Sequence, residues 1–327
     1  MKVLVFDVHA FEEKLLREAL KDFEARLVSV KLDESTVGLA KGYEAVVVFI
    51  HDHGSSVVLE RLKAGGTQLI ITRSAGFNHI DLEAAKRLGL QVANVPKYSP
   101  YAVAEHAVAL ILALNRKLIR AHHRMMDLNF SLNGLIGFDL HGKTVGVLGV
   151  GKIGKVFAQI MRGFGCRVLA YDLQQEEAWA KKHGVSYASL EEIYQSSHII
   201  SLHLPLNEAT KYLIDESALS KMKKGVMLIN TGRGALIKTQ AAIAAIKSGK
   251  LGFLGLDVYE EEETLFFEDH SEDILQDDII ARLLTFPNVL ITSHQAFLTQ
   301  EALENIVSTT LENLIAFQSK KACPHAL

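Results

Sequence analysis

Short apolar runs of strand character alternate with amphipathic stretches along nearly the whole chain. A first set comprises VLVFDV, AVVVFI, QLIITRS and QVANVP, and a second comprises TVGVLGV, RVLAYD, HIISLHLP, VMLINT, LGFLGLDVY and NVLITSH. The intervening stretches show helical spacing, as in Leu16, Ala19, Leu20 and Phe23. Strands that alternate with helices in this way form parallel sheets covered by helices. The pattern therefore predicts an α/β fold.

Chain length and the break between the two sets predict two domains. A chain of 327 residues exceeds the usual size of a single domain. The first set ends near Pro100, and the following stretch from Glu105 to Asn115 is apolar on nearly every side, so a second domain or a partner subunit must bury it. The last amphipathic stretch, Gln300 to Gln318, is expected to pack back on the first domain. We expect a first domain of residues 1–100 plus 298–327 and a second domain of residues 101–297.

Charge and cysteine content exclude several classes of protein. The net charge of -3 and the isoelectric point near 6.5 argue against a nucleic-acid or anionic-membrane partner. Cys166 and Cys323 are too few and too far apart for a disulfide framework or a thiolate metal cluster, which indicates free thiols in a reducing compartment. Asp7 interrupts the N-terminal apolar run, and the longest run, Ala107 to Leu114, is too short to cross a bilayer. We expect a cytoplasmic protein.

The segment VGVLGVGKIG carries the strongest local motif. Gly149, Gly151 and Gly154 spell G-x-G-x-x-G after an apolar strand and before the helical KVFAQIMRGF. These glycines allow a tight turn, close approach of a pyrophosphate and close packing of helix on strand. The helix N-terminus would then meet the diphosphate. Alone, the motif is also compatible with an ordinary glycine-rich turn.

The next predicted strand makes dinucleotide binding the preferred interpretation. RVLAYD ends at Asp172, which lies 18 residues after Gly154, where an acid accepts hydrogen bonds from the adenosine ribose. No arginine follows in DLQQEE, so a ribose 2'-phosphate would meet a carboxylate without a countercharge. The motif therefore predicts NAD in preference to NADP.

Polar residues follow the remaining strands of the second set at the points where these strands end. They are His203 and Pro205 in SLHLP, Thr231 and Arg233 in NTGRG, Asp257 and Glu262 in GLDVYEEE, and His294 in SHQAF. The carboxyl ends of parallel strands meet at the edge where open α/β sheets bind ligands. Each residue alone could be an ordinary turn or core residue, but their coincidence predicts one site.

An arginine, a carboxylate and a histidine beside a nicotinamide indicate reduction of a 2-oxo acid. Arg233 can bind the substrate carboxylate with a planar fork, and His294 can deliver a proton near neutral pH. Glu262 would orient that imidazole and favour its charged form. Its neighbours Glu260, Glu261 and Glu263 are instead expected to form a solvated face.

Two histidine groups are weaker candidates for a metal site. The segment His51–His53 follows a strand but lacks a partner cluster, so a polar loop is the preferred interpretation. His122 and His123 are adjacent on a predicted helix and face different directions. No metal is expected.

Three long motifs carry a resemblance to a known family. They are NTGRGALI, GLDVYEEEETLFFEDHSEDILQDD and SHQAFLTQEAL. From Lys2 to Leu327 the chain resembles the D-isomer-specific 2-hydroxyacid dehydrogenases, especially the fermentative bacterial D-lactate dehydrogenases. The resemblance implies two doubly wound parallel-sheet domains, a flavodoxin-like substrate domain and a Rossmann NAD-binding domain, with the active-site cleft between them. It also implies reversible conversion of pyruvate to D-lactate with NADH.

The same resemblance assigns roles to individual residues. Arg233 would bind the substrate carboxylate and carbonyl, Glu262 would be the acid partner, and His294 would be the general acid and base. The substrate would lie near the backbone of Ala75 and Gly76, with Tyr98 and Phe297 lining its pocket. Lys152 and Ile153 would lie along the cofactor phosphates, and Asp257 would contact the nicotinamide carboxamide. The full cofactor set is then Gly149, Gly151, Lys152, Ile153, Gly154, Asp172, His203, Pro205, Thr231 and Asp257.

Two other functions and the state of assembly stay open at this point. The enzyme could act on a larger D-2-hydroxy acid, or the chain could be a non-catalytic protein that senses NAD. The intact set of Arg233, Glu262 and His294 argues against the second. The apolar helix from Ala102 to Leu114 predicts a homo-oligomer, at least a dimer, if the second domain leaves part of its surface uncovered.

Overall fold

A computed structural model describes the backbone of residues 1–327 and every side chain except that of Thr264. By its internal contacts the chain divides into two compact units, Met1–Ser99 with Phe297–Leu327, and Pro100–Ala296. Each junction lies one residue from the bounds expected from sequence. Pro100 begins the first helix of the second unit, and the ring of Phe297 packs on rings of the first unit.

The first unit is built on one five-stranded parallel sheet with the order β2-β1-β3-β4-β5. Its elements are β1 (Lys2–Val5), α1 (Ala10–Ala19), β2 (Glu24–Leu27), η1 (Val37–Ala40), β3 (Ala45–Val48), α2 (Ser56–Ala64), β4 (Leu69–Thr72), α3 (Leu82–Leu88), β5 (Gln91–Ala93) and α12 (Gln300–Gln318). This strand order is the flavodoxin-like one.

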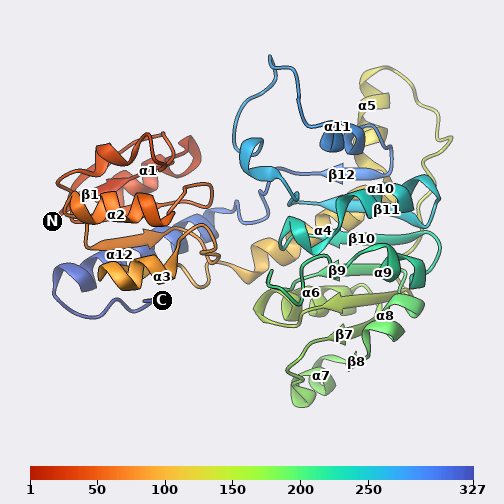
Figure 1. The fold of residues 1–327 in the computed structure, drawn as a ribbon. Helices are drawn as coiled ribbons and strands as arrows, with labels where there is room; N and C mark the ends of the chain where they lie inside the picture. The colour runs from red at the N-terminus through yellow and green to blue at the C-terminus, as the bar shows by residue number, and fades with distance from the viewer. The chain divides into compact units, whose positions relative to one another are not determined.

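The C-terminal helix belongs to this first unit, as the sequence predicted. Helix α12 packs on α1, and its Val307 and Leu314 join Val5 and Val47 in one face of the sheet's core. In Figure 1 the blue helix α12 lies among the red and orange elements, although the whole second unit separates them in sequence. The first unit is therefore discontinuous.

The second unit is built on a seven-stranded parallel sheet with the order β12-β11-β10-β9-β6-β7-β8. Its elements are α4 (Pro100–Arg116), α5 (Leu118–Met126), β6 (Thr144–Leu148), α6 (Lys152–Gly163), β7 (Arg167–Tyr171), α7 (Glu177–His183), β8 (Val185–Tyr187), α8 (Leu190–Ser196), β9 (Ile199–Leu202), α9 (Glu216–Lys221), β10 (Val226–Asn230), η2 (Gly234–Leu236), α10 (Thr239–Lys247), β11 (Leu251–Leu256), η3 (Glu262–Thr264), α11 (Asp278–Leu284) and β12 (Val289–Ile291). The chain winds outward from β6 to β8 and then restarts at β9 on the other side of β6. This reversal is the topological switch point of a Rossmann sheet.

The apolar helix α4 is covered within its own unit. It packs against α6, β10 and β11 (Figure 1), and its Ala107, Ile111 and Leu114 join a core that includes Phe157 and Met227. A partner subunit is therefore not needed to bury this helix. The homo-oligomer itself stays a prediction.

The segment His51–His53 is more deeply buried than a polar loop should be. His51 and Asp52 are buried, and the Asp52 carboxylate accepts hydrogen bonds from the backbone amides of Leu32 and Phe49. Burial raises the pKa of Asp52 to about 7.

Among the described side chains, no group of three or more His, Cys, Asp or Glu residues is arranged to hold a metal ion. No helix within residues 1–327, as the structure describes them, is long and apolar enough to span a membrane.

Candidate active site

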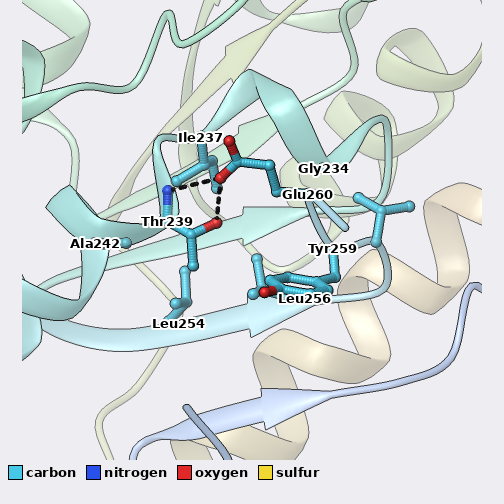
Figure 2. A pocket seen from close by; sticks show the side chains of 9 residues that line it. Gly234, Ile237, Thr239, Ala242, Leu254, Leu256, Tyr259 and Glu260 are labelled. Carbon is cyan, nitrogen blue, oxygen red and sulfur yellow. Dashed lines mark hydrogen bonds between the residues drawn. The ribbon is translucent and has the colours of Figure 1, made fainter. Parts of the chain in front are cut away.

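Arg233 stands at the end of β10 in a turn that its neighbours fix tightly. The Asn230 side chain donates to the Arg233 carbonyl (2.8 Å) and accepts from the Gly232 amide (3.0 Å). Gly234 lies directly on the peptide between Tyr259 and Glu260, where a Cβ atom would come within 2.1 Å of the Tyr259 carbonyl (Figure 2). The turn therefore needs glycine at 234. The guanidinium of Arg233 is partly exposed, and its Nη1 donates to the Gly232 carbonyl at 2.7 Å.

His294 and Glu262 form a close pair in the second unit. The distance from His294 Nδ1 to Glu262 Oε1 is 2.6 Å, and the two side chains are 17% and 15% exposed. The other carboxylate oxygen of Glu262 accepts the backbone N–H of Tyr259 at 2.8 Å. Because an ionised carboxylate can only accept, the imidazole donates through Nδ1 and keeps Nε2 for a ligand.

The backbone of His294 is held in the left-handed region, with φ of 52°. A residue other than glycine seldom adopts this conformation, so its surroundings must impose it. The His294 amide donates to the Asp257 carbonyl at 2.7 Å, while the Asp257 carboxylate accepts the amides of Gln295 and Ala296, each at 2.9 Å. Asp257 is fully buried. Its carboxylate thus fixes the segment that carries the histidine.

A second histidine, His106 on α4, completes the bonds around Asp257. His106 Nε2 lies 3.0 Å from Thr292 Oγ1 and 3.3 Å from Asp257 Oδ1, and Thr292 donates to that same oxygen at 2.6 Å. Burial alone would raise the pKa of Asp257, but hydrogen bonds from His106, Thr292 and Ala296 outweigh burial and lower it. Both oxygens of Asp257 thus have partners inside the protein. Its contact with the nicotinamide carboxamide stays a prediction.

The glycine loop between β6 and α6 is closely packed at two of its three motif glycines and open at the other. Gly149 has φ of +90°, and a Cβ atom there would lie 2.5 Å from the His203 carbonyl oxygen. At Gly154 a Cβ atom would lie 1.9 Å from the Gly149 carbonyl oxygen, whereas at Gly151 it would meet nothing within 4 Å. The first and third glycines therefore permit close packing, and the second leaves open space. That space lies at the N-terminus of α6, which begins with exposed Lys152 and half-buried Ile153.

Asp172 follows β7 and is hydrogen-bonded to the glycine loop. Its Oδ2 accepts the Val150 amide at 2.7 Å, and its Oδ1 accepts the Gln174 amide at 3.1 Å. An ionised carboxylate offers about four lone-pair sites, so these two bonds leave acceptors for a ribose. Its contact with the adenosine ribose stays a prediction.

Three more predicted residues lie at the ends of β9 and β10. Burial lowers the pKa of His203 to about 3, so its imidazole stays neutral; its ring packs on Phe157 with centroids 4.9 Å apart. Pro205 is exposed and accepts the Thr210 hydroxyl through its carbonyl at 2.6 Å. Thr231 is buried, and its Oγ1 has no hydrogen-bond partner among the described residues. A buried hydroxyl of this kind fits a polar group of a bound cofactor.

The four predicted substrate residues lie in the first unit. Ala75 and Gly76 follow β4, and their carbonyls accept hydrogen bonds from Asn94 (3.0 Å) and Ser74 (2.6 Å). The ring of Phe297 packs on Tyr98, with centroids 6.4 Å apart. Two further rings, Phe11 and Phe49, each lie 6.0 Å from Phe297. The structure thus joins the two predicted aromatics into a larger aromatic cluster.

Comparisons with known proteins agree with these features. Residues 108–296 match the family model described as D-isomer specific 2-hydroxyacid dehydrogenase, NAD binding domain. The chain is 49% identical to the D-lactate dehydrogenase of Escherichia coli K12, over 100% of both chains. The chain belongs to the D-isomer specific 2-hydroxyacid dehydrogenases. It is accordingly an NAD-dependent enzyme of the 2-hydroxyacid dehydrogenase type.

Two solved structures have the same fold. The pyruvate reductase of Chlamydomonas reinhardtii superposes with a TM-score of 0.94 at 41% identity, covering 99% of this chain and 98% of that one. The D-lactate dehydrogenase of Aquifex aeolicus, complexed with NAD and lactic acid, gives a TM-score of 0.87 at 37% identity, covering 97% and 96%. These matches confirm the predicted α/β class and the family.

Several residues around the site of this dehydrogenase were missed from the sequence. His106, Thr292 and Glu260 each bond to the segments that carry His294 or Arg233, and Phe11 and Phe49 pack on Phe297. His106 lies mid-helix and Glu260 lies in an acidic run, where nothing local distinguishes them. The only available signal was that Glu260, like Glu262, closely follows the end of a predicted strand.

A glycine substitution tests whether the open space at the α6 N-terminus holds the cofactor. Gly151→Ala should fold normally, because its methyl group meets nothing within 4 Å. It should bind NADH about tenfold or more weakly, because the methyl occupies the space for the diphosphate. NADH fluorescence titration measures this, and Gly163→Ala in the last turn of α6, also in open space, is the matched control. Equal affinity for NADH in both variants would place the diphosphate elsewhere.

Proposed function

We propose that this enzyme interconverts pyruvate and D-lactate with NAD as its cofactor. The observation that carries the proposal is the pair of His294 and Glu262, which lies in the same unit as Arg233 and the glycine loop. The pair supplies a proton donor, and Arg233 supplies a cation for a carboxylate. Its relatives named as D-lactate dehydrogenase and pyruvate reductase support the choice of substrate.

In the proposed reaction, the cofactor supplies the hydride for reduction and takes it back in oxidation. Arg233 binds the pyruvate carboxylate through two parallel N–H donors, which orients the carbonyl carbon. His294 Nε2 donates a proton to the carbonyl oxygen as that oxygen becomes a hydroxyl, and it accepts the proton in lactate oxidation. Glu262, 2.6 Å from Nδ1, stabilises the positive charge on the imidazole before this transfer.

The first unit is proposed to select substrates by size. Tyr98 and Phe297 would lie beside the C3 methyl of pyruvate, and the substrate would lie near the backbone of Ala75 and Gly76. The ring cluster of Phe297, Phe11 and Phe49 restricts the movement of Phe297. A small, rigid aromatic wall favours a methyl group over a branched side chain.

Asp172 is proposed to favour NAD over NADP. A ribose 2'-phosphate would place further negative charge beside this carboxylate, and no arginine lies in the six residues from Asp172 to Glu177.

The two free, buried thiols, Cys166 and Cys323, are consistent with a reducing compartment, and we propose that the enzyme is cytoplasmic.

Assays with two 2-oxo acids and with both lactate enantiomers test the proposed activity. NADH oxidation with pyruvate should exceed that with 2-oxoisocaproate by about tenfold or more in kcat/KM, because extra methylene groups beside an aromatic wall are rejected. With NAD, D-lactate but not L-lactate should be oxidised. Faster reduction of 2-oxoisocaproate would assign a larger D-2-hydroxy acid instead. NADH binding without turnover on either acid would favour a non-catalytic NAD-binding protein.

The pair of Glu262 and His294 makes a prediction about pH. Glu262→Gln removes the negative charge beside the protonated imidazole while it preserves size. The alkaline limb of the pyruvate-reduction profile should therefore move to lower pH, with NADH affinity unchanged, as stopped-flow rates across pH would show. The neighbouring exposed Glu261→Gln is the matched control. A shift with Glu261→Gln and none with Glu262→Gln would assign the acid partner to a different residue.

We further propose that the exposed segment from Leu118 to Ile136 is the homo-oligomer contact. Helix α5 buries none of its side chains, and Leu128, Leu132 and Ile136 are 75%, 79% and 85% exposed. Exposed apolar side chains of this number within one segment are typical of an association site. Light scattering at micromolar concentration should give at least twice the chain mass of 36.1 kDa. Leu132→Asp should lower that mass, and a monomeric wild-type protein would refute the proposal.

A further inference from the structure

Glu260 lies in the acidic run that was expected to be a solvated face, yet its carboxylate accepts three hydrogen bonds from two residues. Its Oε2 accepts the Thr239 hydroxyl at 2.8 Å and the Thr239 amide at 3.3 Å. Its Oε1 accepts a short hydrogen bond from the Tyr212 hydroxyl. Figure 2 shows the carboxylate reaching Thr239 across the small pocket that Gly234, Ile237 and Tyr259 help to line.

The partners of Glu260 both bound the turn that carries Arg233. Thr239 is buried and begins α10, immediately after this turn. The Tyr212 amide donates to the Ala235 carbonyl at 2.8 Å, so the Tyr212 backbone holds the turn. The Tyr212 hydroxyl at the same time binds Glu260. The hydrogen bond that the Tyr212 hydroxyl donates to Glu260 is the main cause that raises the pKa of Tyr212, which keeps the phenol a donor.

On its other side, Glu260 adjoins the loop that carries the acid partner. The preceding residue, Tyr259, donates its amide to Glu262, and Glu262 accepts Nδ1 of His294. The peptide between Tyr259 and Glu260 is also the surface on which Gly234 rests. A continuous series of contacts therefore runs from the Arg233 turn through Glu260 to the pair of Glu262 and His294.

We propose that Glu260 is a positioning residue for the reaction, because its carboxylate fixes where Arg233 stands relative to Glu262 and His294. The inference rests on the proposed role of Arg233 in binding the substrate carboxylate. Glu260 itself is assigned no contact with substrate or cofactor. Its loss should disturb the arginine-dependent part of substrate binding before it disturbs cofactor binding.

Kinetics of Glu260→Ala test this role. The KM for pyruvate should rise about tenfold or more, with a smaller fall in kcat, because the three charge-assisted hydrogen bonds that hold the turn are lost. NADH affinity should stay within about twofold of wild type. Glu260→Gln, which retains one acceptor oxygen, should recover part of the KM. The exposed neighbours provide matched controls, and Glu261→Ala and Glu263→Ala should leave KM unchanged.

A double-mutant cycle with Arg233→Lys separates this inference from the proposed function. If Glu260 acts through Arg233, then Glu260→Ala should add less than about twofold to KM in the Arg233→Lys background. A full additional tenfold rise there would overturn the inference. An unchanged KM in Arg233→Lys alone would instead contradict the proposed role of Arg233.

Two milder variants keep the test valid if Glu260→Ala fails to fold. Thr239→Val and Tyr212→Phe each remove one hydroxyl that bonds to Glu260 and leave the acidic loop intact. Each should raise the KM for pyruvate by a few fold, with NADH affinity unchanged. Wild-type KM in both variants would overturn the inference.

Discussion

All seven strands of the second unit run parallel, so their carboxyl ends meet at one edge, and the candidate active site depends on this constraint. Arg233 follows β10, the loop with Glu262 follows β11, and His294 follows β12. Local turn chemistry then sets the direction of each side chain. A change in one of these turns would therefore redirect a side chain of the candidate site and leave the sheet intact.

Two carboxylates, Asp257 and Glu260, hold these turns through several hydrogen bonds each. Asp257 holds the amides around His294, while Glu260 holds the residues that flank Arg233. A carboxylate can accept several N–H and O–H donors at once, which suits a junction of loops that must keep one geometry. The cost of its burial is offset only when these donors are all in place. The left-handed backbone of His294 is maintained by such a junction.

The sequence predicted the parts of the fold that local pattern determines. Fully buried strands such as β3 and β6 stand out as apolar runs, and the glycine loop and Asp172 have fixed spacing. Strands β2 and β8 were missed because they are short, partly exposed edge strands with no such run. The partnership of His106 with Thr292 joins residues 186 positions apart and depends on how α4 packs, so no local pattern could indicate it.

The most direct test of the account is a crystal structure of the enzyme with NADH and oxamate, a stable mimic of pyruvate. The account predicts both oxamate carboxylate oxygens on the Arg233 guanidinium and the oxamate carbonyl oxygen within about 3.2 Å of His294 Nε2. Nδ1 of His294 should remain on Glu262. Oxamate bound away from Arg233, or its carbonyl oxygen out of reach of His294, would contradict the central claim that these strand-end residues form one catalytic site.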